Sequence, residues 1–117
     1  MRPTKSIRPL GCKRRRLVRK DSNVIRDTTY TFYSDPGHAW LRVPLSTLSR
    51  LDIRHRISRF SYVSNDLSTA YLEEDCDASV FFDAYQQRFG EPPAIKEQYI
   101  DDREELFHDA TSFMEHV

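Results

Sequence analysis

The sequence predicts an α+β fold with a small antiparallel sheet of four to five strands, one packed helix and an amphipathic C-terminal helix. Short β-branched and aromatic runs, separated by turn residues, indicate the strands. Apolar residues at helical spacing indicate one helix over about 76–89 and another over about 102–116. A chain of 117 residues fits a single domain.

The first two strands are expected to form a β-hairpin over residues 29–43. Residues 28–34 and 39–43 have the composition of strands. Residues 35–37 read Asp-Pro-Gly, which is turn chemistry, because proline fixes φ and Gly37 is free to take a positive φ.

A short helix is expected next, over residues 45–51. Pro44 suits the first turn of a helix, and leucines then recur at every third position. Asp52 is expected to end this helix, because aspartate tolerates the left-handed conformation better than most residues.

A second hairpin is predicted from residues 58–64 and 69–74. Phe60 and Tyr62 alternate onto one face of the first of these strands, and Asn and Asp at positions 65–66 supply the turn.

The packed helix has clear start and stop signals. Asp75 or Asp77 is expected to cap its N-terminus, and Gly90 with two following prolines ends it. Its apolar stripe consists of Ala78, Phe81, Phe82, Tyr85 and Phe89. Residues 94–100 are expected to form an edge strand.

The C-terminal helix is predicted to begin with a capping box formed by Asp101 and Glu104. Its apolar face consists of Leu106, Phe107, Ala110, Phe113, Met114 and Val117. This face would pack either on its own domain or across a homodimer.

Charge divides the chain into a basic N-terminal arm, residues 1–27, and an acidic domain, residues 28–117. The arm contains ten Lys or Arg and two Asp, and the domain contains eight Lys or Arg and sixteen Asp or Glu. The sequence shows neither an apolar run long enough to span a membrane nor a secretory signal. Its two cysteines suit a reducing compartment, so we expect a cytoplasmic protein.

The arm is a candidate nucleic-acid-binding segment. Six positive charges within eight residues can contact phosphates without reading the base sequence. The candidate contacts are Lys13, Arg14, Arg15, Arg16, Arg19 and Lys20. The competing interpretation is a solvated flexible tail or an upstream extension of the domain.

Two short segments are weaker candidates for chemistry. His38 beside Asp35 could act as a base or a metal ligand, although the turn explains both residues. Carboxylates at residues 73–77 could bind a hard cation, although acidic residues are also expected at a helix N-terminus. The same carboxylates oppose a reactive thiolate at Cys76, which disfavours a Cys–His pair. We therefore assign no catalytic residue, metal ligand or cofactor.

Three segments together resemble a family of small proteins of bacteriophages, plasmids and their bacterial hosts. They are YTFYSDPGHAWL at residues 30–41, ISRFSY at 57–62 and YLEEDCD at 71–77. The family has no assigned activity, and its members usually start near the first strand, so the arm departs from the pattern. The resemblance implies a mobile-element protein in the cytoplasm of a bacterial host.

The leading hypothesis is a non-enzymatic accessory protein that binds a host macromolecule, such as a component of a host defence system, with no membrane association. An acidic face and the aromatic hairpin are the expected contact surfaces. The expected protein-binding residues are Tyr30, Phe32, Trp40, Glu73, Glu74, Asp75 and Asp77. Nucleic-acid binding through residues 13–20 is the second hypothesis, and a small metal-assisted hydrolase is the third.

Overall fold

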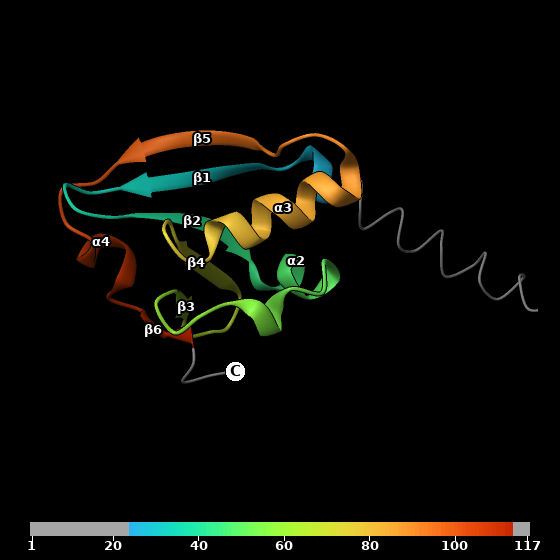
Figure 1. The fold of residues 1–117 in the computed structure, drawn as a ribbon. Coiled ribbons are helices and arrows are strands. Elements are labelled where there is room, and N and C mark those ends of the chain that lie inside the picture. Colours follow the sequence, from blue (N-terminus) through green and yellow to red (C-terminus); the bar gives the residue numbers. More distant parts are fainter. Residues whose placement is uncertain (1–23, 114–117) are drawn as a thin grey trace, which may run out of the picture.

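The computed structural model describes residues 24–113, which form an α+β domain around a six-stranded sheet (Figure 1). The strands are β1 (Thr29–Ser34), β2 (Ala39–Pro44), β3 (Tyr62–Ser64), β4 (Thr69–Glu73), β5 (Ala94–Tyr99) and β6 (Ala110–Ser112). The helices are α2 (Leu45–Arg50), the 3-10 turn η2 (Arg54–Arg56), α3 (Ala78–Phe89) and α4 (Glu104–Phe107). The strand order across the sheet is β5-β1-β2-β4-β3-β6.

Both predicted hairpins are confirmed. β1 pairs antiparallel with β2, with Phe32 opposite Leu41, and β3 pairs antiparallel with β4, with Val63 opposite Ala70. Antiparallel pairing of β2 with β4 joins the two hairpins into one sheet. Phe60, which we expected in the second hairpin, instead lies in the turn before β3 with an exposed side chain.

The predicted small antiparallel sheet of four to five strands is right in outline and differs from the structure in two respects, because the sheet has six strands and β5 runs parallel to β1. β4 runs in the same direction as β1, and α3 then carries the chain back along one face of the sheet. β5 therefore starts at the same end as β4 and joins the outer edge of β1, as in other helical crossovers. Residues 94–99 are thus an edge strand, as expected.

The main core lies between α3 and the sheet. Tyr30 packs edge-on against Phe81, with ring centroids 5.0 Å apart, and its hydroxyl donates a hydrogen bond of 3.0 Å to the Ile25 carbonyl. Burial, with a smaller contribution from Tyr85, raises the pKa of Tyr30 to about 12. α3 ends at Gly90 in the left-handed conformation, with φ 78°, as the sequence predicted.

A single packed helix is too simple a description, because α2 and α4 also bury side chains. Leu45 and Leu48 of α2 join the main core, and Asp52 follows this helix with φ 59°, as predicted. Residues 24–27, which we had assigned to the arm, form a helical turn that places Ile25 in the core. The folded domain therefore includes this turn.

The long C-terminal helix is not present within the described residues, which end at residue 113, so Met114 and Val117 of its predicted face lie outside them. α4 covers only residues 104–107, and β6 then pairs antiparallel with β3. Phe113 lies in the main core, whereas Phe107 contacts aromatic side chains on the opposite face of the sheet. One helix has a single apolar face and cannot reach both sites. Pairing with the open edge of β3 therefore prevails over the local helical pattern.

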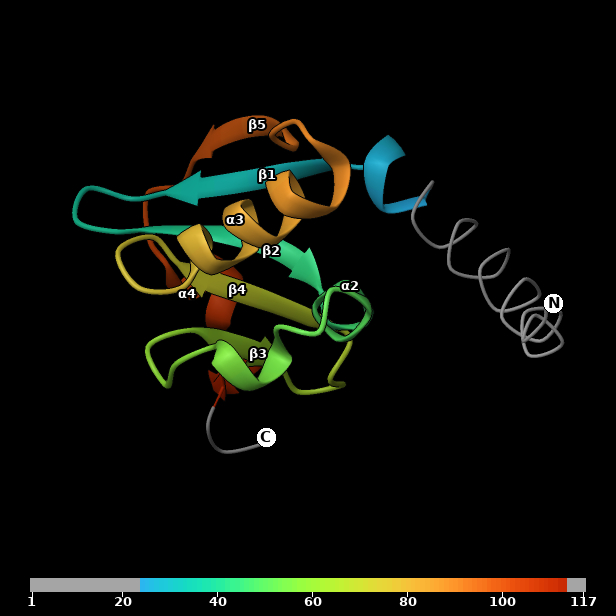
Figure 2. The same ribbon diagram turned by 45° about the vertical axis from the view of Figure 1, so that its right-hand side comes forward.

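The face of the sheet away from α3 is covered in part by α4 (Figure 2). Phe107 stacks on Tyr62 at 4.2 Å between ring centroids and meets Trp40 and Tyr71 edge-on at 4.8 and 5.3 Å. We call these four residues the aromatic cluster. Because α4 ends at Phe107 and the chain then forms β6, residues 24–113 do not contain the long amphipathic helix that we proposed as a dimer interface. Dimerisation stays a prediction.

No helix within residues 24–113 is both long enough and apolar enough to cross a membrane.

Candidate functional site

An open pocket of about 330 Å³ lies on the α4 side of the sheet, near the turn between β1 and β2. We call it the tip pocket. Its lining residues are His38, Trp40, Arg59, Phe60, Tyr62, Glu73, Asp75, Cys76, Arg103 and Ser112.

The tip pocket brings together all three segments that we singled out in the sequence. His38 comes from the turn after β1, Phe60 from the segment before β3, and Asp75 from the loop between β4 and α3. Sequence reasoning missed Arg59 and Arg103 as pocket residues. Arg59 belongs to the motif at residues 57–62, which could have indicated it, whereas no local sequence feature indicated Arg103.

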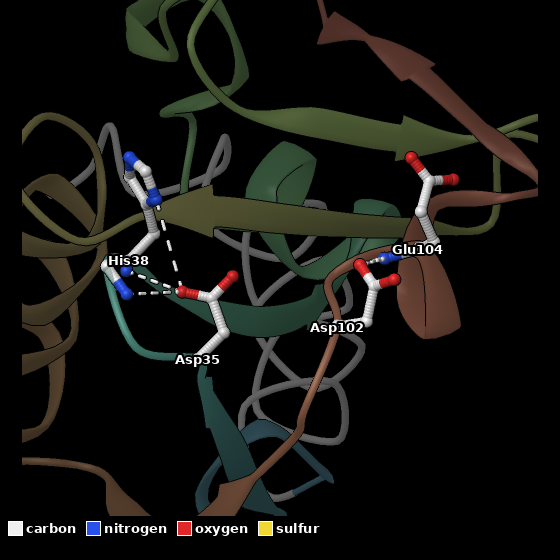
Figure 3. A network of polar contacts seen from close by, with 5 residues as sticks. Asp35, His38, Asp102 and Glu104 are labelled. Atoms are coloured by element: carbon white, nitrogen blue, oxygen red, sulfur yellow. Dashed lines mark hydrogen bonds and ion pairs between the residues drawn. The ribbon is translucent and has the colours of Figure 1, made fainter.

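The turn between β1 and β2 is shaped by the carboxylate of Asp35 (Figure 3). One carboxylate oxygen accepts hydrogen bonds from the backbone N–H groups of Gly37 at 2.8 Å and His38 at 2.7 Å. The His38 ring stacks over Trp40 with 5.6 Å between ring centroids. Gly37 does not adopt the positive φ that we expected, because this carboxylate, rather than a left-handed glycine, holds the turn.

Replacing Asp35 with asparagine is expected to lower the Tm at neutral pH, by an amount that shrinks in acid. Burial acts to raise the pKa of this carboxyl group, but the two backbone hydrogen bonds and the charges of His38 and Arg103 outweigh it and lower the pKa. The stabilisation is therefore fully present above about pH 4 and is lost as the pH falls through the folded-state pKa. Thermal unfolding followed by circular dichroism from neutral pH to about pH 2.5 tests this. A Tm difference that stays constant over that range would contradict it.

The buried carboxylate of Asp77 connects the loops that line the tip pocket. Asp77 is 2% exposed, and its carboxylate accepts hydrogen bonds from the Ser58 backbone N–H at 3.0 Å, the Ser58 hydroxyl at 2.7 Å and the Ser61 hydroxyl. The Ser61 hydroxyl in turn accepts a bond of 2.9 Å from the Glu73 backbone N–H. These bonds tie the loop that carries Arg59 and Phe60 to the start of α3.

Asp77 stands at the N-cap position of α3, but its side chain makes no capping hydrogen bond. The predicted role of Asp75 or Asp77 as a capping side chain is therefore wrong. Similarly, the carboxylate of Asp102, rather than that of Asp101, accepts the Glu104 backbone N–H, at 3.0 Å (Figure 3).

The thiol of Cys76 is exposed and sits among carboxylates. The Glu73 carboxylate accepts the backbone N–H groups of Asp75 at 2.8 Å and Cys76 at 2.9 Å. Desolvation of the thiol by its neighbours, a hydrogen bond with Glu73 and the charges of Glu73, Asp77 and Asp75 all raise the pKa of Cys76. A raised pKa keeps the thiol protonated at neutral pH, which disfavours nucleophilic catalysis through Cys76 and His38.

Several of the expected contact residues are not on the surface. Tyr30 and Trp40 are 2% and 1% exposed, and Asp77 is buried with them. We expected a partner to contact these side chains, but they are occupied by apolar packing or by hydrogen bonds inside the domain. Phe32 packs against the core, so the aromatic hairpin is mainly an interior feature.

The remaining acidic candidates have different exposures. Glu74 and Asp75 are exposed, whereas Glu73 is half-buried. The acidic face predicted for residues 73–77 is therefore narrower than expected. The arm residues Lys13, Arg14, Arg15, Arg16, Arg19 and Lys20 lie outside the described residues, and nucleic-acid binding through them stays a prediction.

The hydrolase hypothesis required His38, Asp35 and the carboxylates of residues 73–77 to gather in one site. Across the described range, 24–113, no three His, Cys, Asp or Glu side chains come together in a way that could hold a metal ion. The Asp35 carboxylate is instead engaged by the turn, and that of Asp77 by two serines.

Comparison with known proteins gives no relative from which to assign the site: no family model, curated protein or solved structure matches the chain.

Proposed function

We propose that this chain is a non-enzymatic binding protein that takes a segment of a partner protein into the tip pocket. The observation that supports this most strongly is the convergence of three separate sequence segments on one open pocket. Segments far apart in a chain contribute side chains to one pocket in many ligand sites.

The composition of the pocket favours a protein partner. Phe60 is 55% exposed at the rim, and the Arg59 guanidinium lies over its ring, 5.4 Å from the ring centroid. Aromatic and arginine side chains are enriched among the residues that contribute most to protein interfaces. An apolar side chain of the partner would contact Phe60 and the edges of the pocket aromatics.

The charged residues of the tip pocket indicate which side chains the partner segment carries. Glu73 and Asp75 line one part of the pocket, and Glu74 is exposed beside them. Carboxylates of this kind attract a basic group and disfavour an acidic one. Arg59 and Arg103 line the same pocket. The segment that fits best therefore carries charged groups of both signs next to an apolar side chain, a basic one for the carboxylates and an acidic one for the arginines.

The resemblance to phage and plasmid proteins extends the proposal to the partner's origin. On that basis the partner is a protein of a bacterial host, and a component of a host defence system is the first candidate. Capture of such a protein would be stoichiometric and would leave it chemically unchanged.

The test is quantitative affinity capture from a nuclease-treated bacterial host lysate, with Phe60→Ala and Asp75→Lys compared with the natural sequence. A partner recovered by the natural protein is expected to be lost by both variants, because each removes a pocket contact. Calorimetry with the purified partner should then give one partner per chain, with the partner recovered intact.

Two matched controls make the result specific to the pocket. Tyr99→Ala removes a 61% exposed aromatic on β5, and Asp83→Lys reverses an exposed charge on α3, and both positions lie outside the pocket lining. Both controls should retain the partner. Pocket variants that capture the same proteins as these controls would refute the proposal.

A further inference from the structure

A second pocket, of about 480 Å³, lies beside the aromatic cluster, on the same face of the sheet as the tip pocket. Its floor includes Arg42 of β2 and Tyr71 of β4, which are opposite each other in the pairing of these strands. One wall is the turn between β3 and β4, and the other is α4 with the segment that follows it. We call this the polar pocket.

The two pockets are separate sites. The ring of Phe107 contacts Tyr62, which lines the tip pocket, and Tyr71, which lines the polar pocket. No residue lines both pockets, so an inference about the polar pocket does not depend on the partner segment proposed above.

Several charged groups around the polar pocket already have partners within the domain. One carboxylate oxygen of Asp66 accepts hydrogen bonds from the hydroxyl groups of Ser64 at 2.6 Å and Ser68 at 2.7 Å, and these bonds shape the turn. The Nε2 atom of His108 lies 3.7 Å from the Asp109 carboxylate. These groups are therefore engaged in holding the two walls.

Two charged groups of the lining, those of Arg42 and Glu105, have no such partner. Both side chains are exposed, and within residues 24–113 neither forms a hydrogen bond or an ion pair. Arg42 comes from the sheet and Glu105 from α4, so opposite charges enter the pocket from two elements without meeting each other. A ligand that carries both charges can contact both side chains.

The Tyr71 hydroxyl adds a hydrogen-bond donor near Arg42. Desolvation raises the pKa of Tyr71, although the charge of Arg42 acts to lower it. The hydroxyl therefore stays protonated at neutral pH and can donate to the anionic group that the guanidinium binds.

We propose that the polar pocket binds a small zwitterion, whose carboxylate contacts Arg42 and Tyr71 and whose ammonium group contacts Glu105. A free amino acid or a short peptide has this chemistry. A guanidinium forms paired, charge-assisted hydrogen bonds with a carboxylate, and an ammonium group donates charge-assisted bonds to one. A purely anionic ligand would meet the three carboxylates of the lining, and a purely cationic one would meet Arg42, so a ligand with both charges fits best.

The test is an NMR titration of the isotope-labelled full-length chain with the proteinogenic amino acids and with glycylglycine, one at a time. At least one of these zwitterions is expected to bind with a Kd below about 5 mM and to shift the backbone amide signals of β4 and α4. Glycylglycine distinguishes a short peptide from a free amino acid as the source of the two charges.

Capped forms of the best ligand test whether both charges are needed. Its N-acetylated form lacks the terminal ammonium group, and its amidated form lacks the terminal carboxylate. Each capped form is expected to bind about tenfold or more weakly than the parent. This comparison needs no change to the protein, so it decides the proposal even where a variant does not fold.

Arg42→Gln and Glu105→Gln should each weaken binding of the best ligand by about tenfold or more, because each removes one of the two charges that the ligand contacts. The matched controls are Lys96→Gln and Glu97→Gln, which remove exposed charges of the same two signs on β5, outside the polar pocket. Both controls should bind with a Kd within about twofold of that of the natural sequence. Circular dichroism establishes that each variant is folded.

Three outcomes would overturn the proposal. The first is that no zwitterion binds with a Kd below about 5 mM. The second is that either capped form binds as tightly as its parent, which would mean that the pocket does not recognise both charges. The third is that Arg42→Gln and Glu105→Gln bind the ligand as tightly as the two controls do.

Discussion

Replacing Asp77 with alanine is expected to lower the free energy of unfolding by about 3 kcal/mol. The carboxylate is 2% exposed and accepts three hydrogen bonds from Ser58 and Ser61. Alanine would leave the buried Ser61 hydroxyl and the Ser58 backbone N–H without their acceptor, and an unmade buried hydrogen bond costs more than a made one contributes. Denaturation with urea at neutral pH measures the loss.

Two variants give this prediction its controls. Asp77→Asn should lose less stability than Asp77→Ala, because an amide oxygen still accepts from the Ser58 N–H and the serine hydroxyls can rotate to accept from the amide. Asp75→Ala, at an exposed position two residues away, should change the free energy by less than about 0.5 kcal/mol. If Asp77→Ala were as mild as Asp75→Ala, the network would not hold the pocket loops.

Replacing Phe107 with alanine is expected to cost about 3 kcal/mol and to shift the fluorescence of Trp40 to longer wavelength. Phe107 is 7% exposed and contacts Trp40, Tyr62 and Tyr71. Removing its ring opens the aromatic cluster and lets water reach Trp40, which is 1% exposed and the protein's single tryptophan. Urea denaturation and the emission spectrum of the folded protein measure the two effects separately.

Phe60→Ala is the matched control, because Phe60 is an aromatic residue that is 55% exposed. Its loss should change stability by less than about 0.5 kcal/mol. An unchanged emission spectrum in Phe107→Ala, together with wild-type stability, would mean that α4 does not cover the sheet as described.

Local sequence signals determined the elements whose stability is mostly local. The turns at residues 35–37 and 65–66 specified two hairpins, and the apolar stripe from Ala78 to Phe89 specified α3. Gly90 ended α3 because its left-handed backbone is costly for other residues. The same short segments also marked most of the tip pocket, because motif residues in turns and loops are the ones that a sheet leaves accessible.

Tertiary structure decided the features that depend on distant partners. The segment after residue 108 has a helical apolar pattern, but the open edge of β3 offers it backbone hydrogen bonds, and it becomes β6. The sequence predicts that the side chain of Asp77 caps a helix. In the structure, the hydroxyls of two serines sixteen and nineteen positions earlier donate hydrogen bonds to its carboxylate instead. Sequence patterns cannot reveal such pairings, because they report neighbours along the chain.

The sequence by itself therefore determined the α+β class, the two hairpins, the main helix and the three segments that carry the candidate site. Only the tertiary structure decided that β5 lies parallel to β1 and that Tyr30, Trp40 and Asp77 are interior. The physical reason is that turns and amphipathic periodicity act over a few residues, whereas burial and sheet pairing depend on which distant surfaces the folded chain brings into contact.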